Sequence, residues 1–375
     1  MATSYWTSSQ YKHWVVDRVT LRHARADDLR HASARELALI TIFFANVITR
    51  LGKRLEMRQQ VIATAIVFFR RFYLKNSYCE TEPFFVAAAC CYVAAKVEEA
   101  PVHLKSVVGE ARNLFGQEWH IHSIPSDHTK LGEMEFYLLE DLEFNLVVFH
   151  PYHDLADLCT TQDAEDNLAK KGLQTGKERG KLVLDEGAMQ TAWFIINDSF
   201  RTELCLVHPP YLIAVAALYM TCVLHNSISG KLHPPNQPQP PTSAPMSAGG
   251  FASARQSPAP FPLDGRSTPT ASSSLTPIST TPTSMSPRDE ILNFLASLNV
   301  SLETVSTVCQ EIMSMYSLWD TFTDRSEQDK NRRNDRRESQ RGWFRGSPPP
   351  EKDLIEEKEI VKIVENMRKA RCVYF

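Results

Sequence analysis

The chain has 375 residues, a net charge of −3 and a hydrophobic fraction of 43%, which is enough for two ordinary domains with sizeable cores. Its charge excludes the basic excess of a dedicated nucleic-acid binder. The eight cysteines contain no C-x-x-C pair, which indicates reduced thiols instead of a disulfide framework or zinc site. No apolar run has the length of a membrane span. We therefore expect a soluble intracellular protein without a membrane partner.

Residues 1–32 are polar overall but contain several aromatic side chains. The segment Thr7–Ser9 can cap a short helix, on which Tyr11 and Trp14 would share one face. Trp6 and Trp14 lie outside the main apolar pattern of the chain. We expect this N-terminal arm to dock, either onto the body of the chain or onto a partner protein.

Residues 33–150 have the apolar periodicity of a unit of five helices. Ser33 and Glu36 form a capping box. The apolar run behind them stops at Gly52, which predicts that the first helix ends there. Further apolar stripes predict helices over 57–74, 83–99, 104–119 and 129–144.

The helix over 83–99 is the expected centre of this unit. Between Phe84 and Ala95 it carries no charged side chain, which is typical of a helix buried on all sides. Charged residues follow abruptly at Lys96, Glu98 and Glu99. The charged end indicates that this buried helix reaches a surface there.

The sequence contains an internal repeat. An offset of 127 residues places Pro83–Tyr92 over Pro210–Tyr219 and aligns a second pair of helical runs. The repeat predicts a second unit over 151–322, with helices near 186–202, 209–226, 288–298 and 301–322. Lys96 falls over Val223, so the charged end is not part of the repeated pattern.

Three polar segments interrupt or follow the second unit. Residues 163–181 lack apolar periodicity and predict a surface loop, and the Pro-rich insert 229–287 is expected to be disordered. Its Ser/Thr-Pro pairs are either kinase sites or part of a tolerated loop expansion. Residues 323–375 form a charged tail with a short amphipathic helix, and its basic run is either a nuclear-import signal or a charged linker.

We find no motif of nucleotide binding, zinc catalysis or nucleophilic catalysis, and therefore expect a binding protein without catalytic residues, cofactor or metal. Glu135 lies between the inward-facing Met134 and Leu138 of the fifth helix. Its side chain can reach the charged end of the third helix. Lys96 and Glu135 form either an ordinary surface ion pair or a donor and acceptor offered to another protein.

Family resemblance favours the second interpretation. The tandem helical units, the segment Lys96–Glu99 and the Met134-Glu135 pair resemble the cyclin box. Further short matches are similar to the transcriptional cyclins of the cyclin C type; they lie at 5–11, 58–64, 135–140, 150–152, 197–198 and 201–206.

The resemblance implies an all-α fold: two tandem five-helix cyclin boxes with an N-terminal helix, alongside the expected insert and tail. The expected domains are the arm 1–32, a first box over 33–150, a second box over 151–322 and the tail 323–375. The implied partner is a Mediator-associated cyclin-dependent kinase, which places the protein in the nucleus. Its implied contacts are Lys96, Glu98, Glu99, Glu135, Trp6, Tyr11 and Trp14.

The same resemblance implies a second contact surface. Trp193, Asn197 and Asp198 correspond to a groove between the two boxes, where another subunit of the Mediator kinase module would bind. Ordinary packing and capping would also explain these three residues. Two alternative functions stay open: a DNA-binding general transcription factor with tandem cyclin folds, or a transcriptional cyclin paired with a different kinase.

Overall fold

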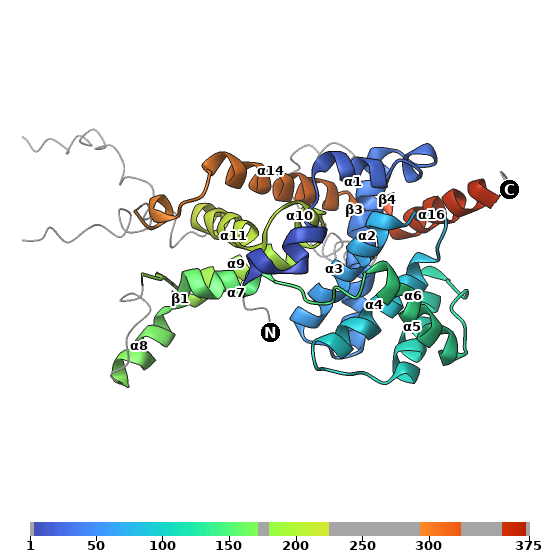
Figure 1. Cartoon of the computed structure of the whole chain (residues 1–375), viewed down its shortest axis with the longest axis horizontal. Helices are drawn as coiled ribbons and strands as arrows, with labels where there is room; N and C mark the ends of the chain where they lie inside the picture. Colours follow the sequence, from blue (N-terminus) through green and yellow to red (C-terminus); the bar gives the residue numbers. More distant parts are fainter. Residues whose placement is uncertain (1–3, 172–179, 225–292, 324–354, 373–375) are drawn as a thin grey trace, which may run out of the picture.

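The computed structural model describes residues 4–171, 180–224, 293–323 and 355–372. These residues form two groups of helices that lie side by side (Figure 1). Within the described ranges, no helix is long and apolar enough to span a membrane. The insert 229–287 with its Ser/Thr-Pro pairs, the basic run of the tail and residues 373–375 lie outside the described residues.

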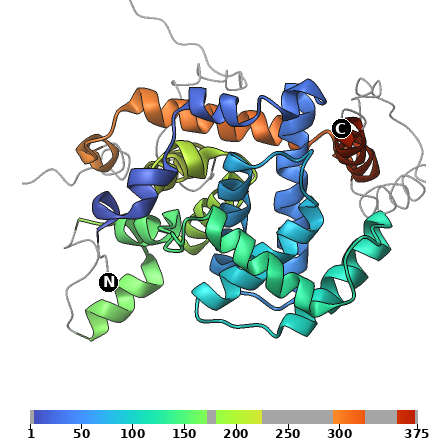
Figure 2. The ribbon, with the colours of Figure 1, turned by 45° about the vertical axis from the view of Figure 1, so that its right-hand side comes forward.

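The first group surrounds one buried helix. The helix α4 (Pro83–Val97) contacts all the other members of the group, namely α2 (Ala34–Arg54), α3 (Gln59–Lys75), α5 (Leu104–Trp119) and α6 (His128–Asp141). Its alanines and cysteines let neighbouring helices approach closely, and Pro83 suits its first position. The predicted centre of the unit is confirmed, and Figure 2 shows the helices packed around it.

Gly52 does not end the first helix, as the sequence analysis predicted. The helix α2 continues to Arg54. A Cβ atom at Gly52 would lie 2.6 Å from Cγ1 of Ile62 on α3. The glycine therefore allows close packing of two helices inside the first group, and the capping box at Ser33 is present as predicted.

The second group repeats this plan around α11 (Pro210–Leu224), which packs against α7 (Pro151–Leu158), α9 (Glu186–Ser199) and α14 (Leu302–Trp319). Both ends of α11 follow those of α4 at the same offset of 127 residues. A short helix, α10 (Leu204–Val207), precedes α11, and residues 293–297 are helical. The correspondence of α4 and α11 agrees with the repeat found in the sequence, and the division into two boxes stays a prediction.

The predicted surface loop 163–181 is partly wrong. Its first half is the helix α8 (Gln162–Lys170), with Asp163 and Glu165 in the first turn and Lys170 in the last, charges that stabilise both helix ends. Two short strands flank this segment, β1 (Cys159–Thr161) and β2 (Leu182–Leu184). They pair in parallel, with Cys159 opposite Leu182.

The arm is not the single short helix that was predicted. It consists of a 3-10 turn, η1 (Tyr5–Thr7), and a π-helical turn, η2 (Gln10–Trp14), followed by α1 (Arg18–Ala24) and a second 3-10 turn, η3 (Asp28–Arg30). The helix α1 lies beside α14 in both views (Figures 1 and 2). The arm thus crosses the second group before the chain enters α2.

The tail helix is present and docked. Strand β3 (Phe322–Thr323) pairs with β4 (Ile355–Glu356), which leads directly into α16 (Glu357–Cys372). The helix α16 packs against α2 and α5 of the first group (Figure 1). The tail helix thus covers the first group, whereas the arm contacts both groups, through α3 in the first and α14 in the second.

Candidate functional site

Lys96 and Glu135 meet at the end of the buried helix α4. The Nζ atom of Lys96 donates to Oε1 of Glu135 on α6, and the ammonium group lies 5.1 Å from the ring centroid of Tyr92. The hydrogen bond with Glu135 raises the pKa of Lys96. The Lys96 side chain is 45% exposed and that of Glu135 is 14% exposed, so the ammonium group reaches solvent while most of the glutamate is covered.

Glu98, another residue of the implied contact set, is bonded within the chain. Its carboxylate accepts hydrogen bonds from Nε2 of Gln60 at 2.9 Å and from the hydroxyl of Thr64 at 2.6 Å. The Thr64 hydroxyl also lies 2.7 Å from Nε2 of the buried His150. Glu98 therefore joins α3 to the end of α4 within the chain, whereas Glu99 is exposed.

The backbone is strained where α4 and α6 end. Glu99, Glu143 and Phe144 have φ values of 53°, 51° and 56°, in the left-handed region. This conformation costs a residue with a side chain about 1 kcal/mol. The helix α6 was predicted to reach Phe144 but ends at Asp141, because the chain turns back there and the amide of Phe144 donates to the carbonyl of Leu139.

Large apolar side chains are exposed along α6 and just after it. Phe136, Tyr137, Phe144 and Val147 have exposed fractions between 57% and 73%. None of these four residues was singled out from the sequence as a candidate site residue. The signal was available: Phe136 and Tyr137 lie out of phase with the buried Leu131 and Leu138. Exposed apolar side chains in such numbers indicate an interaction surface.

The aromatic residues of the arm divide into anchored and exposed ones. Trp14 is buried at 2% exposure, with the cationic groups of Arg71 and Lys75 about 5 Å from its ring centroid. Trp6 and Tyr11 are 54% and 43% exposed, and their rings meet edge to face. The arm therefore docks onto its own chain through Trp14 and presents Trp6 and Tyr11 outward.

Trp193, Asn197 and Asp198 lie together on α9, in three different situations. Trp193 stacks on Tyr152 at 4.5 Å and is 38% exposed. The Oδ1 atom of Asn197 accepts a hydrogen bond from the Tyr152 hydroxyl. Asp198 accepts from Arg201 at 2.6 Å and from the Tyr316 hydroxyl at 2.8 Å. Asn197 and Asp198 thus hold the second group together, while Trp193 keeps a free face.

Comparison with known proteins supports one family throughout. A model of the cyclin N-terminal domain matches residues 26–147. An RNA polymerase II holoenzyme cyclin-like subunit of Mycosarcoma maydis is 33% identical over 383 residues, covering 85% of this chain and 90% of that protein. Cyclin-C of Drosophila melanogaster is 37% identical over 228 residues, covering 60% of this chain and 78% of that protein. The chain belongs to the cyclin family and is of the cyclin C type.

Solved structures similar to this cyclin include chains of two complexes. One is the yeast TFIIK (Kin28/Ccl1/Tfb3) complex, with a TM-score of 0.44, 23% identity and coverage of 60% of this chain and 89% of that chain. The other is the CAK complex of Chaetomium thermophilum bound to ATP-gamma-S, with a TM-score of 0.41, 23% identity and coverage of 60% and 70%.

Proposed function

We propose that this cyclin is the regulatory subunit of a Mediator-associated cyclin-dependent kinase that phosphorylates the RNA polymerase II transcription machinery in the nucleus. The relatives named as RNA polymerase II holoenzyme subunits support the setting. The observation that carries the proposal is the ion pair of Lys96 and Glu135 at the end of a buried helix, with the lysine reaching solvent. A preformed donor and acceptor can bind a kinase helix end without first being ordered.

The surface around the pair fits a kinase helix that has charged and apolar faces. Lys96 and Glu135 supply the polar contacts, and Phe144 is an exposed apolar contact just beyond α6. We assign Glu99 to the activation region of the kinase and remove Glu98 from the contact set, because its carboxylate is bonded to α3. Trp6 and Tyr11 supply the partner-specific contacts, and Trp14 anchors them.

In this mechanism the cyclin activates the kinase by positioning the regulatory helix of the kinase. Its surface would press the regulatory helix of the kinase inward, so that a glutamate of that helix pairs with the lysine that holds the ATP phosphates. Binding only the active arrangement shifts the kinase toward it. The buried helix α4 is a suitable support, because it contacts every other helix of the first group and close-packed helices are hard to displace.

The free face of Trp193 and the neighbouring Phe194, 60% exposed, form the best candidate contact for another subunit of the kinase module. Asn197 and Asp198 would support that contact from behind, because their polar groups already have partners within the chain. The proposal for this second surface is therefore narrower than the one drawn from the resemblance.

A charge reversal tests the kinase contact. The double variant Lys96→Glu and Glu135→Lys keeps an ion pair inside the chain but presents reversed charges to the kinase. We expect an unchanged melting temperature and a loss of kinase affinity and activation by roughly thirtyfold, or about 2 kcal/mol. The measurements are titration of the co-purified kinase, identified by mass spectrometry, and phosphorylation of a protein substrate.

The matched control reverses an exposed pair within α6, Lys130→Glu with Glu133→Lys, whose charged atoms lie 2.8 Å apart. Full affinity of the first double variant would refute the contact assignment. Equal losses in both double variants would show that general charge, and not this pair, attracts the kinase.

A further inference from the structure

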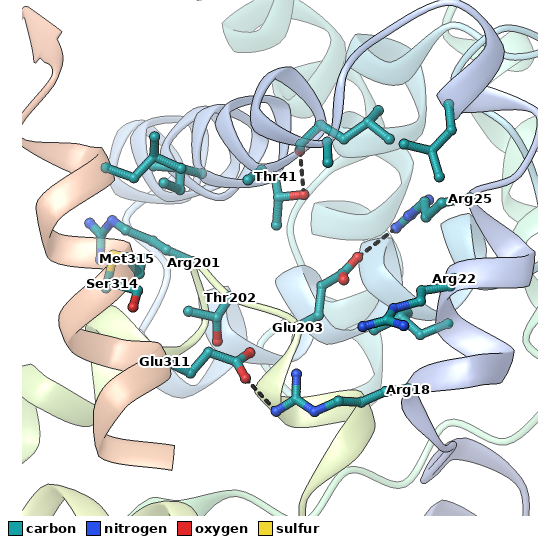
Figure 3. A pocket seen from close by; sticks show the side chains of 17 residues that line it. Arg18, Arg22, Arg25, Thr41, Arg201, Thr202, Glu203, Glu311, Ser314 and Met315 are labelled. Carbon is teal, nitrogen blue, oxygen red and sulfur yellow. Dashed lines mark hydrogen bonds and ion pairs between the residues drawn. The ribbon is translucent and has the colours of Figure 1, made fainter. Parts of the chain in front are cut away.

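A cavity of about 400 Å³ lies away from the kinase-binding surface, between α1, the first half of α2, residues 201–203 and α14. Figure 3 shows α14 on one side of it and the arginines of α1 on the other. The volume is in the range of natural ligand pockets. No residue of α4 or α6 lines it, so it is a separate site from the pair of Lys96 and Glu135.

The cavity has an apolar floor. Leu21, Leu37 and Met315 line it and are each less than 9% exposed, while Leu29 stands at its rim with 44% exposure. An apolar side chain inserted here would lose contact with water without leaving any polar group of the floor unpaired. At about 25 cal/mol per Å² of buried apolar surface, an anchor residue placed here would contribute to binding, together with polar contacts at the rim.

The rim is cationic, and its arginines differ in how they are paired. Arg25 is buried and donates to Glu203 at 3.0 Å. Arg18 pairs with Glu311 at 2.6 Å, but its side chain is 46% exposed, so the pair can exchange at little cost. Arg22, one turn further along α1, is exposed and has no carboxylate within ion-pair distance among the described residues.

We propose that this cavity is a docking site for a peptide segment of a partner protein that carries an apolar side chain next to acidic residues. The apolar side chain fills the floor beside Leu29 and Met315. A carboxylate binds Arg22, and a neighbouring one replaces Glu311 on Arg18. We infer an acidic occupant because Arg22 would gain a carboxylate partner and Arg18 could exchange Glu311 for another carboxylate.

The test uses the full chain and three labelled synthetic peptides of about ten residues, which share a central leucine pair and differ in their flanks of glutamate, glutamine or lysine. We expect binding, followed by fluorescence anisotropy, only for the glutamate-flanked peptide, and weaker binding at higher salt. Failure of that peptide to bind, or equal binding of the glutamine-flanked peptide, would overturn the proposal.

Two variants test whether the peptide binds in the cavity. Arg22→Glu is expected to weaken binding at least about tenfold, and Leu29→Asn to weaken it severalfold. Both positions are exposed, so folding is not at stake. Arg112→Glu, at an exposed arginine of α5, is the charge-matched control. An equal loss in Arg112→Glu and Arg22→Glu would show a general charge effect and overturn the site.

A final measurement distinguishes this site from the proposed kinase contact. The charge-reversed variant of Lys96 and Glu135 should bind the acidic peptide as well as the parent chain does. Peptide binding that disappears with that variant would place the peptide on the kinase-binding surface and would contradict a docking site at the cavity.

Discussion

His150 shows how one buried side chain ties the first group to the chain that leaves it. It is 1% exposed, and its Nε2 atom lies 2.7 Å from the Thr64 hydroxyl, which in turn donates to Glu98. Burial lowers the pKa of His150 to about 3. The imidazole is therefore neutral in the folded protein over the whole range in which a histidine of the unfolded chain titrates.

This burial predicts a pH dependence of stability. Below about pH 6.5, the pKa of a histidine in the unfolded chain, the unfolded chain binds a proton that the folded chain does not. The free energy of unfolding therefore decreases as the pH is lowered, by up to about 1.4 kcal/mol per pH unit, until the pKa of His150 in the folded chain is reached. We expect His150→Gln to reduce this slope. Urea unfolding at pH 7.5, 6 and 5 measures it, with His122→Gln at an exposed histidine as the control. An unchanged slope would contradict the assignment.

The tail helix α16 is the element whose role differs most from expectation. Its apolar stripe of Ile360, Val364 and Met367 is buried at 3% exposure or less. At its start Glu357 accepts from both terminal nitrogens of Arg50 and from the Trp119 indole. Amphipathic spacing predicted this helix, but its docking depends on partners 307 and 238 residues earlier in the chain.

We expect Ile360→Ala to lower the free energy of unfolding by about 2–5 kcal/mol, because it leaves a cavity under a fully buried side chain. Hydrogen exchange should then rise in α2 and α5, which α16 covers. Lys362→Ala, at an exposed position of the same helix, is the control. Unchanged protection of α2 and α5 would show that α16 is not part of the folded core.

At the scale of the whole molecule, Arg201 joins the two groups of helices. Its Nε atom donates to Asn46 of α2, Nη1 donates to Asp198 of α9, and its guanidinium lies 3.8 Å from the ring centroid of Trp319 on α14. Burial raises the pKa of Asp198, and the nearby Arg201 charge acts against this rise. The relative position of the two groups depends in part on one side chain.

Replacing this residue should loosen the junction. We expect Arg201→Met to cost about 2–3 kcal/mol and to broaden thermal unfolding, because Asp198 loses a charged partner and α2 loses its link to α9. Differential scanning calorimetry measures both effects, and Arg112→Met is the control. The double variant with Asp198→Asn should recover part of the loss. A single sharp transition at the parent temperature would refute the role of Arg201.

Local patterns were sufficient for the main helices of both groups and for placing Lys96 near Glu135, but not for α8 or for the arm. The alanine-rich run after Pro83, the capping box at Ser33 and the repeat at Pro210 depend on residues close in the chain, and the structure confirms them. Lys96 and Glu135 could be placed near each other from sequence, because Lys96 follows the apolar run of the third helix and Glu135 lies between inward-facing residues of the fifth. Helix existence was predicted better than helix ends, because the ends depend on tertiary contacts such as that of Gly52 with Ile62.

Only the three-dimensional structure shows where these side chains point and which residues they contact. Adjacent glutamates at 98 and 99 look alike in sequence, yet one bonds to α3 and the other faces solvent, because the chain turns left-handed between them. The same holds for the cavity beside Arg22 and for the docking of α16, which bring together segments from opposite ends of the chain. Such contacts depend on the shape and burial of segments that are far apart in the sequence. Local periodicity reports only on neighbouring residues and therefore does not predict them.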